Sequence, residues 1–322
     1  MIKLNTKFKK FLSISLLLLL CLLNISIKPN AKTETFTYTI PDKKIEDFSL
    51  SEIESIIGEH LKNLNLNYSV GSTEYESYLR NFLFGNDTTI KDTKLIHLFN
   101  AYAATYLNET SKNLSNTKRS FNTNNKTIKM IKQEILNEEN NTPNSPSTRA
   151  YKGYNYSAAR SYALKHAFKY NNADYASFSN RGGDCTNFVS QILVAGGIPK
   201  NNNWYFRYVP NPSNYPPRKE TFSRSWVNAT DFYNYWKNKV PVIDGRYKDN
   251  IIPHANVGDI IQYYEINTGI KWHSVFVSGK TSNDLRITQH TGDRKDDLWK
   301  GTVGPIGSHG GSETYFKLLK FR

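Results

Sequence analysis

The chain has 322 residues, of which 38% are hydrophobic and 22% charged, so a collagen-like or wholly disordered protein is excluded. Two cysteines exclude a disulfide framework and a four-cysteine zinc site. The net charge of +14 favours an anionic partner without identifying it. Because a domain usually holds about 100–200 residues, this length suggests two domains.

Residues 1–31 have the composition of a secretory signal peptide. Lysines without any acidic residue precede a compact apolar block at 11–23. The block is shorter than the ~20 residues that span a bilayer, which is typical of a signal sequence. We therefore expect export with cleavage after Ala31. The residues around Ala31 match a cleavage site poorly, so an uncleaved membrane anchor remains the alternative.

The segment 32–139 is predicted to form a mostly helical domain of unknown role. Its apolar residues recur at near-helical spacing, for example over 45–61 and 91–107. It contains no catalytic motif, and its histidines, His60 and His97, stand alone in the sequence. We interpret both histidines as structural.

The segment 140–149 is predicted to be a linker between two domains. It contains two prolines and no other apolar residue. Charge also changes across it, from −1 over residues 32–149 to +10 over residues 150–322. We therefore expect the activity in the basic second domain, at 150–322.

The second domain is predicted to begin with helices and to end with strands. Helical periodicity occurs at residues 156–170, 185–195 and 225–238. Alternating patterns typical of strands occur at residues 259–264, 272–278, 285–291 and 314–319. Helices followed by strands indicate an α+β domain with an antiparallel sheet.

Cys185 is the candidate nucleophile. Removal of the signal peptide leaves it as the only cysteine, and an unpaired thiol in an oxidising compartment is either reactive or a buried apolar residue. It begins a predicted helix, whose free N–H groups would stabilise a thiolate, with Asp184 as the N-cap. Gly182 and Gly183 would let a substrate backbone approach the sulfur.

His273 is the candidate general base, because it begins an apolar strand that would hold its ring rigidly. A third group should orient the imidazole. His290 on the next strand is the first candidate, and Gln289 and Asp293 compete with it. A register slip of one residue would exchange His290 for Gln289.

These motifs resemble the putative amidase domain family of secreted bacterial proteins, which is similar to the NlpC/P60 and CHAP cysteine hydrolases. The resemblance covers roughly residues 150–322 and implies a papain-like fold with Cys185 as nucleophile and His273 as base. NlpC/P60 proteins often have a histidine as third residue, which favours His290. The matching runs are NRGGDCTNFVSQ at 180–191, GDII at 258–261, HSVFV at 273–277 and TQHT at 288–291.

An oxyanion hole is also required, and the backbone N–H of Cys185 is a natural donor. Tyr175 and Asn180 are candidates for a second donor, and the resemblance to NlpC/P60 domains favours Tyr175. Gln289 is a further candidate for contact with the substrate. No phosphate loop, zinc spacing or nucleic-acid motif is present, so we expect no cofactor, no metal and no nucleic-acid partner.

The sequence therefore predicts an exported cysteine amidohydrolase that cleaves amide bonds in cell-wall peptidoglycan or a related peptide through a thioester. Anionic wall polymers would suit the basic second domain. A membrane partner is expected only if the signal segment is uncleaved. Two alternatives remain open, a protein-directed cysteine peptidase and a non-catalytic wall-binding module with a vestigial site.

Overall fold

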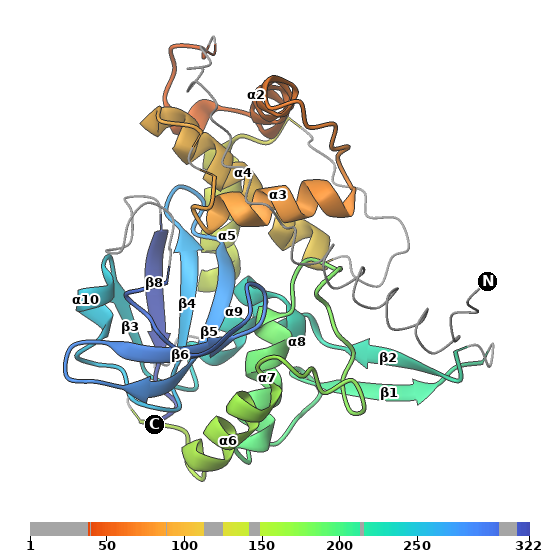
Figure 1. Cartoon of the computed structure of the whole chain (residues 1–322), viewed down its shortest axis with the longest axis vertical. Coiled ribbons are helices and arrows are strands. Elements are labelled where there is room, and N and C mark those ends of the chain that lie inside the picture. Colours follow the sequence, from red (N-terminus) through yellow and green to blue (C-terminus); the bar gives the residue numbers. More distant parts are fainter. Residues whose placement is uncertain are drawn as a thin grey trace, which may run out of the picture. The chain divides into compact units, whose positions relative to one another are not determined.

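The computed structural model describes residues 38–112, 125–141, 149–212, 216–302 and 314–322, except positions 39 and 88. Residues 38–322 form one compact unit (Figure 1). The expected signal peptide and residues 142–148 of the expected linker lie outside the described residues. Among the residues described, we found no helix with the length and apolar character needed to cross a membrane.

The first part of this unit is helical, as predicted. Ser49 and Ser72 cap the first two long helices by accepting hydrogen bonds from the backbone N–H groups of Glu52 and Tyr75. The apolar faces of the helices meet in a hydrophobic cluster that is separate from the two clusters of the second part. The elements are η1 (Ile45–Asp47), α2 (Leu50–Asn63), α3 (Thr73–Leu83), α4 (Thr93–Lys112) and α5 (Ile128–Asn140).

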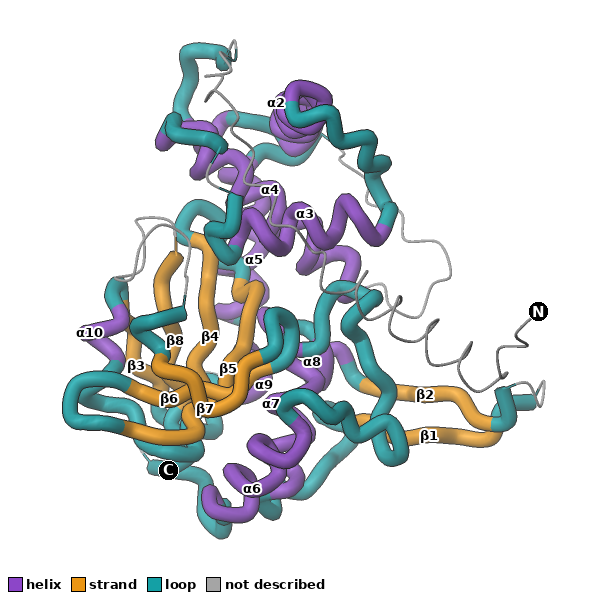
Figure 2. The backbone as a smooth tube through the Cα atoms, in the orientation of Figure 1, coloured by secondary structure: helices purple, strands orange, loops and turns teal. Residues whose placement is uncertain are grey.

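The second part is built on an antiparallel sheet with strand order β3-β8-β4-β5-β6-β7, so the predicted α+β class is confirmed (Figure 2). Four of these strands were predicted, namely β4 (Ile260–Glu265), β5 (Lys271–Lys280), β6 (Leu285–Gln289) and β8 (Thr314–Leu319). Prediction missed β3 (Val242–Gly245) and β7 (Arg294–Leu298), together with the hairpin of β1 (Phe206–Pro210) and β2 (Arg218–Phe222). β3 and β7 lie at the sheet edges, where a strand needs no alternating apolar pattern.

The helix predicted at 185–195 is confirmed as α7 (Cys185–Ala195), whereas the one predicted at 225–238 is divided in two. Asn228 has extended backbone angles and accepts a hydrogen bond from the Asp231 N–H, so it ends one helix and caps the next. The remaining helices are α6 (Tyr156–His166), α8 (Arg224–Val227), α9 (Ala229–Trp236) and α10 (Lys248–Ile251).

The two faces of β5 are buried in different clusters. Phe276 packs with Phe188 and Val189 of α7, whereas Val275 and Val277 pack in the cluster on the other face. Alternation along the strand therefore places Ser274 on the α7 side and His273 on the opposite side. The register of β4 and β5 shifts at Trp272, which is the extra residue of a bulge beside His273.

Candidate active site

Cys185 is the first residue of α7, directly after a turn of two glycines with positive φ. A Cβ atom on Gly182 would lie 3.2 Å from the Cβ of Ser111, a residue of α4. The sequence suggested that these glycines admit a substrate backbone. In the structure, the close neighbour of Gly182 is a helix of the same chain.

A chain of side-chain hydrogen bonds ties the start of α7 to β5. The hydroxyl oxygens of Thr186 and Ser274 lie 3.1 Å apart. Gln262 of β4 donates to the Ser274 hydroxyl at 3.0 Å and to the carbonyl of Ala229 at 2.9 Å. Because Thr186 follows Cys185 and Ser274 follows His273, this link holds the start of α7 against the part of β5 that contains His273, although the His273 side chain lies on the opposite face of that strand.

Burial disfavours a thiolate at Cys185. The side chain is only 6% exposed, and this burial raises the pKa of its thiol, with a further rise from the charge of Asp184. The Thr186 hydroxyl, the Ser274 backbone and the charge of Arg80 act in the opposite direction. The expectation that the helix N-terminus lowers this pKa was therefore wrong for the conformation described, because desolvation outweighs it.

His273 is buried as a neutral imidazole. Its ring lies between Phe84, the residue directly after α3, at 5.0 Å between centroids, and Tyr263 of β4, at 5.3 Å. Burial, together with the charges of Arg80 and Arg294, lowers its pKa to about 4. Neither ring nitrogen has a hydrogen-bond partner among the described residues, so Cys185 and His273 are not hydrogen-bonded to each other in this conformation.

Gln289, not His290, shares a sheet face with His273. Val277 of β5 pairs with Ile287 of β6, so alternation places Gln289 on the same face of the sheet as His273. The Gln289 side chain favours the charged form of His273, although it forms no hydrogen bond of normal geometry with the ring. Its Nε2 donates to the Thr291 and Gly292 carbonyls at 3.2 and 2.9 Å, which leaves its Oε1 for the imidazole.

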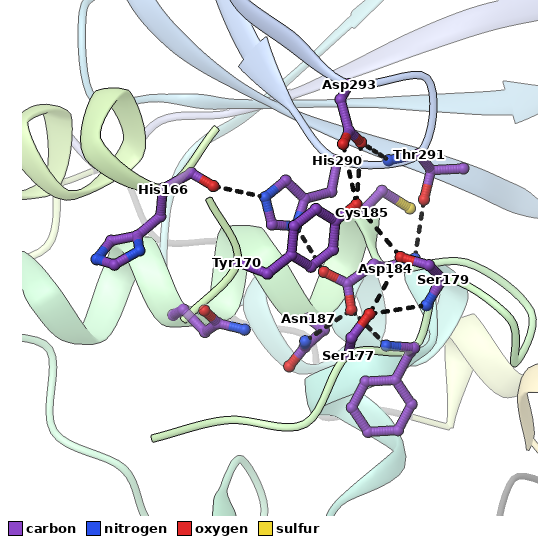
Figure 3. Close-up of polar contacts among 12 residues, drawn as sticks. His166, Tyr170, Ser177, Ser179, Asp184, Cys185, Asn187, His290, Thr291 and Asp293 are labelled. Carbon is purple, nitrogen blue, oxygen red and sulfur yellow. Dashed lines mark hydrogen bonds and ion pairs between the residues drawn. The ribbon is translucent and has the colours of Figure 1, made fainter. Parts of the chain in front are cut away.

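His290 makes no contact of the kind predicted for a third catalytic residue. Its Nδ1 lies 2.6 Å from Oδ2 of Asp184, and its Nε2 lies 2.9 Å from the carbonyl oxygen of His166 (Figure 3). The expectation that His290 orients His273 is wrong, because both nitrogens have other partners. Asp293 is engaged as well, since it accepts hydrogen bonds from Tyr170 Oη and from the Thr291 N–H.

The two candidates for a second oxyanion donor lie upstream of α7. The ring of Tyr175 stacks on Trp226 at 5.8 Å and packs against Phe206 at 5.4 Å. Asn180 is exposed in the loop before the glycine turn. Their roles as oxyanion donors stay predictions.

Comparison with known protein families identifies the family to which the second half of the chain belongs. The family described as "Putative amidase domain" matches residues 153–313, half of the chain. The chain belongs to this family. The domain is thereby placed among amidase-like hydrolases, and it contains Cys185, His273 and Gln289.

One curated relative of this amidase-domain protein is the uncharacterized protein YjcM of Bacillus subtilis (strain 168). It is 27% identical over 166 residues, which cover 49% of this chain and 36% of YjcM. The match therefore spans about a third of that relative's length. No solved structure matches the chain.

Residues outside the amidase domain complete the surroundings of its site, and sequence reasoning missed them. Phe84 packs on His273, and the Nε of Arg80 would lie 3.7 Å from a Cβ on Gly183. Asn228 donates hydrogen bonds to the side chains of Asn108 and Ser111, at 3.0 and 2.7 Å. No local signal identifies the residues outside the domain, because each lies more than 70 positions from both His273 and Cys185.

The cavity beside Cys185 is small. Its volume is about 20 Å³, and α4 lines one side of it with Leu107, Asn108 and Ser111. This is about enough space for one water molecule and too little for a peptide. Within the described part of the chain, no group of three or more His, Cys, Asp or Glu side chains could hold a metal ion.

Proposed function

We propose that the protein is an exported cysteine amidohydrolase that cleaves amide bonds in peptidoglycan or a related peptide. The observation that carries this proposal is the position of Cys185 at the N-terminus of α7, linked through Thr186 and Ser274 to the strand that contains His273. Nucleophilic catalysis requires a base that can reach the cysteine, and a histidine on the strand next to the start of the helix can supply it. Membership of the amidase domain family supports amide hydrolysis as the reaction.

The reaction proceeds in two steps. His273 takes the thiol proton of Cys185, and the sulfur attacks the amide carbonyl carbon. The carbon–nitrogen bond then breaks, and His273 returns the proton to the leaving amine, which leaves a thioester. Water attacks the thioester, His273 takes a proton from the water, and the acid and the free thiol are released. The backbone N–H at the start of α7 stabilises both oxyanions, with Tyr175 or Asn180 as the second donor.

Catalysis requires a more open conformation than the one described. The sulfur and a ring nitrogen of His273 have to come within hydrogen-bond reach, and a substrate carbonyl has to reach the sulfur. Movement of the α3 and α4 side chains that contact the site would admit the substrate, and the His273 ring would have to turn from the opposite face of β5 toward the sulfur. A nucleophile helix packed on an antiparallel sheet also supports a papain-like fold of the NlpC/P60 kind for residues 150–322.

The composition supports a substrate in the cell wall. Residues 150–322 carry a charge of +10, which would attract anionic wall polymers and concentrate the enzyme on its substrate. The signal-like residues 1–31 support export to the compartment where such polymers occur.

Mass analysis of purified peptidoglycan incubated with the full chain tests the proposal. We expect new fragments, each pair having one new amine and one new carboxylate. Cys185→Ala and His273→Ala should each abolish their release, and the double variant should be no worse than either, because the two residues act as one unit. His254→Gln, at an exposed position, is the control and should keep full activity.

Three results would contradict the proposal. Full activity of Cys185→Ala would exclude a cysteine mechanism. Cleavage of an unfolded protein, with peptidoglycan left intact, would favour a cysteine peptidase. Binding to peptidoglycan without any fragment release would favour a wall-binding module.

A further inference from the structure

Asp184, the residue before the candidate nucleophile Cys185, forms a buried pair with His290 (Figure 3). Their side chains are each 1% exposed, and Oδ2 of Asp184 lies 2.6 Å from Nδ1 of His290. The other ring nitrogen lies 2.9 Å from the carbonyl oxygen of His166. Because a carbonyl oxygen can only accept, Nε2 of His290 carries a proton.

The short contact requires a second proton between Nδ1 and Oδ2. Without it, a nitrogen lone pair would face a carboxylate oxygen at 2.6 Å, which is repulsive. Oδ1 of Asp184 accepts hydrogen bonds from the Phe178 N–H at 2.6 Å and from Asn187 Nδ2 at 2.9 Å. These donors favour the carboxylate form of Asp184 and therefore the imidazolium form of His290.

The surroundings of His290 suit a cation. Its ring lies between Phe188, at 3.6 Å and 3° between planes, and Tyr170, at 3.9 Å and 17°. Aromatic faces attract a positive charge and exclude water from it. The hydroxyl of Tyr170 is hydrogen-bonded to Asp293, so a second carboxylate lies beyond that ring.

We propose that His290 is a positioning residue that acts on Cys185 through Asp184, by neutralising the buried carboxylate next to the nucleophile. This inference rests on the proposed role of Cys185 as a nucleophile. Asp184 occupies the N-cap position of α7, but its side chain makes no capping hydrogen bond. An uncompensated carboxylate there would oppose both the thiolate and the oxyanion that forms beside it.

Other charged and titratable groups also face Cys185, and the effect of His290 adds to theirs. Arg80 of α3 lowers the pKa of the Cys185 thiol, whereas the charge of Asp184 raises it. His273 of β5 is neutral near pH 7, since its pKa is about 4. Among these groups, the negative charge that opposes a thiolate at Cys185 is therefore that of Asp184.

Geometry and charge can be separated, because Asp184 is held in two ways. Its N–H donates to the hydroxyl of Thr291 at 2.8 Å, independently of the carboxylate. His290→Asn keeps an N–H donor near the Nδ1 position and removes the cation. Asp184→Asn in the same chain then removes the anion as well, which restores neutrality.

The test is the pH dependence of iodoacetamide alkylation of Cys185 in the full chain, measured for the wild type, His290→Asn and the double variant Asp184→Asn/His290→Asn. We expect His290→Asn to raise the alkylation midpoint by about one pH unit or more. The double variant should return to the wild-type midpoint, because its pair is neutral again. A purely structural role would leave the double variant at least as perturbed as the single one.

An unchanged midpoint in a folded His290→Asn variant, or a double variant that stays raised, would overturn the proposal. If His290→Asn does not fold, ¹⁵N NMR of the wild type decides, with the His290 signals identified by their proximity to the rings of Phe188 and Tyr170. Protons on both ring nitrogens are expected, and a single proton on Nε2 would contradict the charged pair. Neither measurement depends on turnover, so failure of amide hydrolysis is detected separately.

Discussion

Cys185 is a neutral thiol and His273 a neutral imidazole in the described conformation, because burial disfavours the charged form of each residue. Burial disfavours charge, so it raises the pKa of the thiol and lowers that of the imidazole to about 4. An ion pair is therefore not the stable form in the described conformation. A neutral imidazole still accepts a proton once the sulfur comes within reach.

Protein stability should reveal the buried neutral state of His273. Its pKa is about 4 in the folded chain and 6.5 in the unfolded reference, so the unfolded chain binds more protons between these values. Stability present above pH 6.5 is therefore lost as the pH falls toward 4. Urea unfolding should show the wild type losing up to about 3 kcal/mol more than His273→Gln between pH 7 and 4. His254→Gln is the exposed control, and equal losses in the wild type and His273→Gln would contradict burial of a neutral ring.

Gln289 should orient His273, because it lies on the same sheet face and its Oε1 is available to the ring. We expect Gln289→Ala to lower kcat by roughly 10- to 100-fold with little change in KM, which corresponds to loss of one buried hydrogen bond that Gln289 would form with the ring in the reactive conformation. Gln289→Glu keeps an acceptor and should retain more activity than the alanine variant. Asp293→Asn is the control, since Asp293 bonds to Tyr170 instead. A larger loss from Asp293→Asn than from Gln289→Ala would show that Gln289 is misassigned.

At the scale of elements, the link between α7 and β5 sets the relative position of nucleophile and base. It depends on the buried hydroxyls of Thr186 and Ser274, both 0% exposed. Thr186→Val keeps the shape of the side chain and removes this bond. We expect a loss of about 1 kcal/mol in the free energy of unfolding together with a lower kcat. Urea unfolding and turnover measure both effects.

The control for this link is Ser161→Ala on the exposed face of α6, where the hydroxyl only bonds to a backbone carbonyl of its own helix. That variant should change neither quantity. If Thr186→Val leaves both stability and kcat unchanged, the link does not position the site.

At the scale of the whole unit, helices α3 and α4 cover the site of the amidase domain. Phe84 packs on His273, and Asn228 is hydrogen-bonded to Asn108 and Ser111 above the small cavity. An ion pair between Lys271 at the start of β5 and Glu139 of α5 adds another contact between the helical segment and the amidase domain. The helical segment therefore contributes to the burial that shifts both pKa values.

Phe84→Ala should open this cover. Loss of the ring exposes His273 to water, so its pKa should rise from about 4 toward 6.5, and alkylation of Cys185 at pH 7 should become faster. NMR titration of His273 and alkylation kinetics measure the two effects. Phe168→Ala removes a ring that is already 65% exposed and serves as the matched control. An unchanged pKa in Phe84→Ala would show that α3 does not cause the burial.

Local sequence determined the elements that carry the chemistry. The apolar spacing after Cys185 and the glycines at its end predict α7 to the residue, and alternation predicts β5 with His273 near its start. These features depend on neighbours within a few positions, so a pattern can report them. The strands β3 and β7 were missed because each lies at an edge of the sheet and has a neighbouring strand on one side only. Such a strand does not need an alternating apolar pattern that the sequence would show.

Only the tertiary structure decided which residues meet. The pairing of β5 with β6 places Gln289 on the His273 face and sends His290 to Asp184, a choice that a one-residue change in register would reverse. The cover by Phe84 and Ser111 comes from helices remote in the sequence, and it reverses the expected effect of the helix N-terminus on Cys185. Desolvation depends on everything packed around a group, whereas a motif contains only its neighbours along the chain.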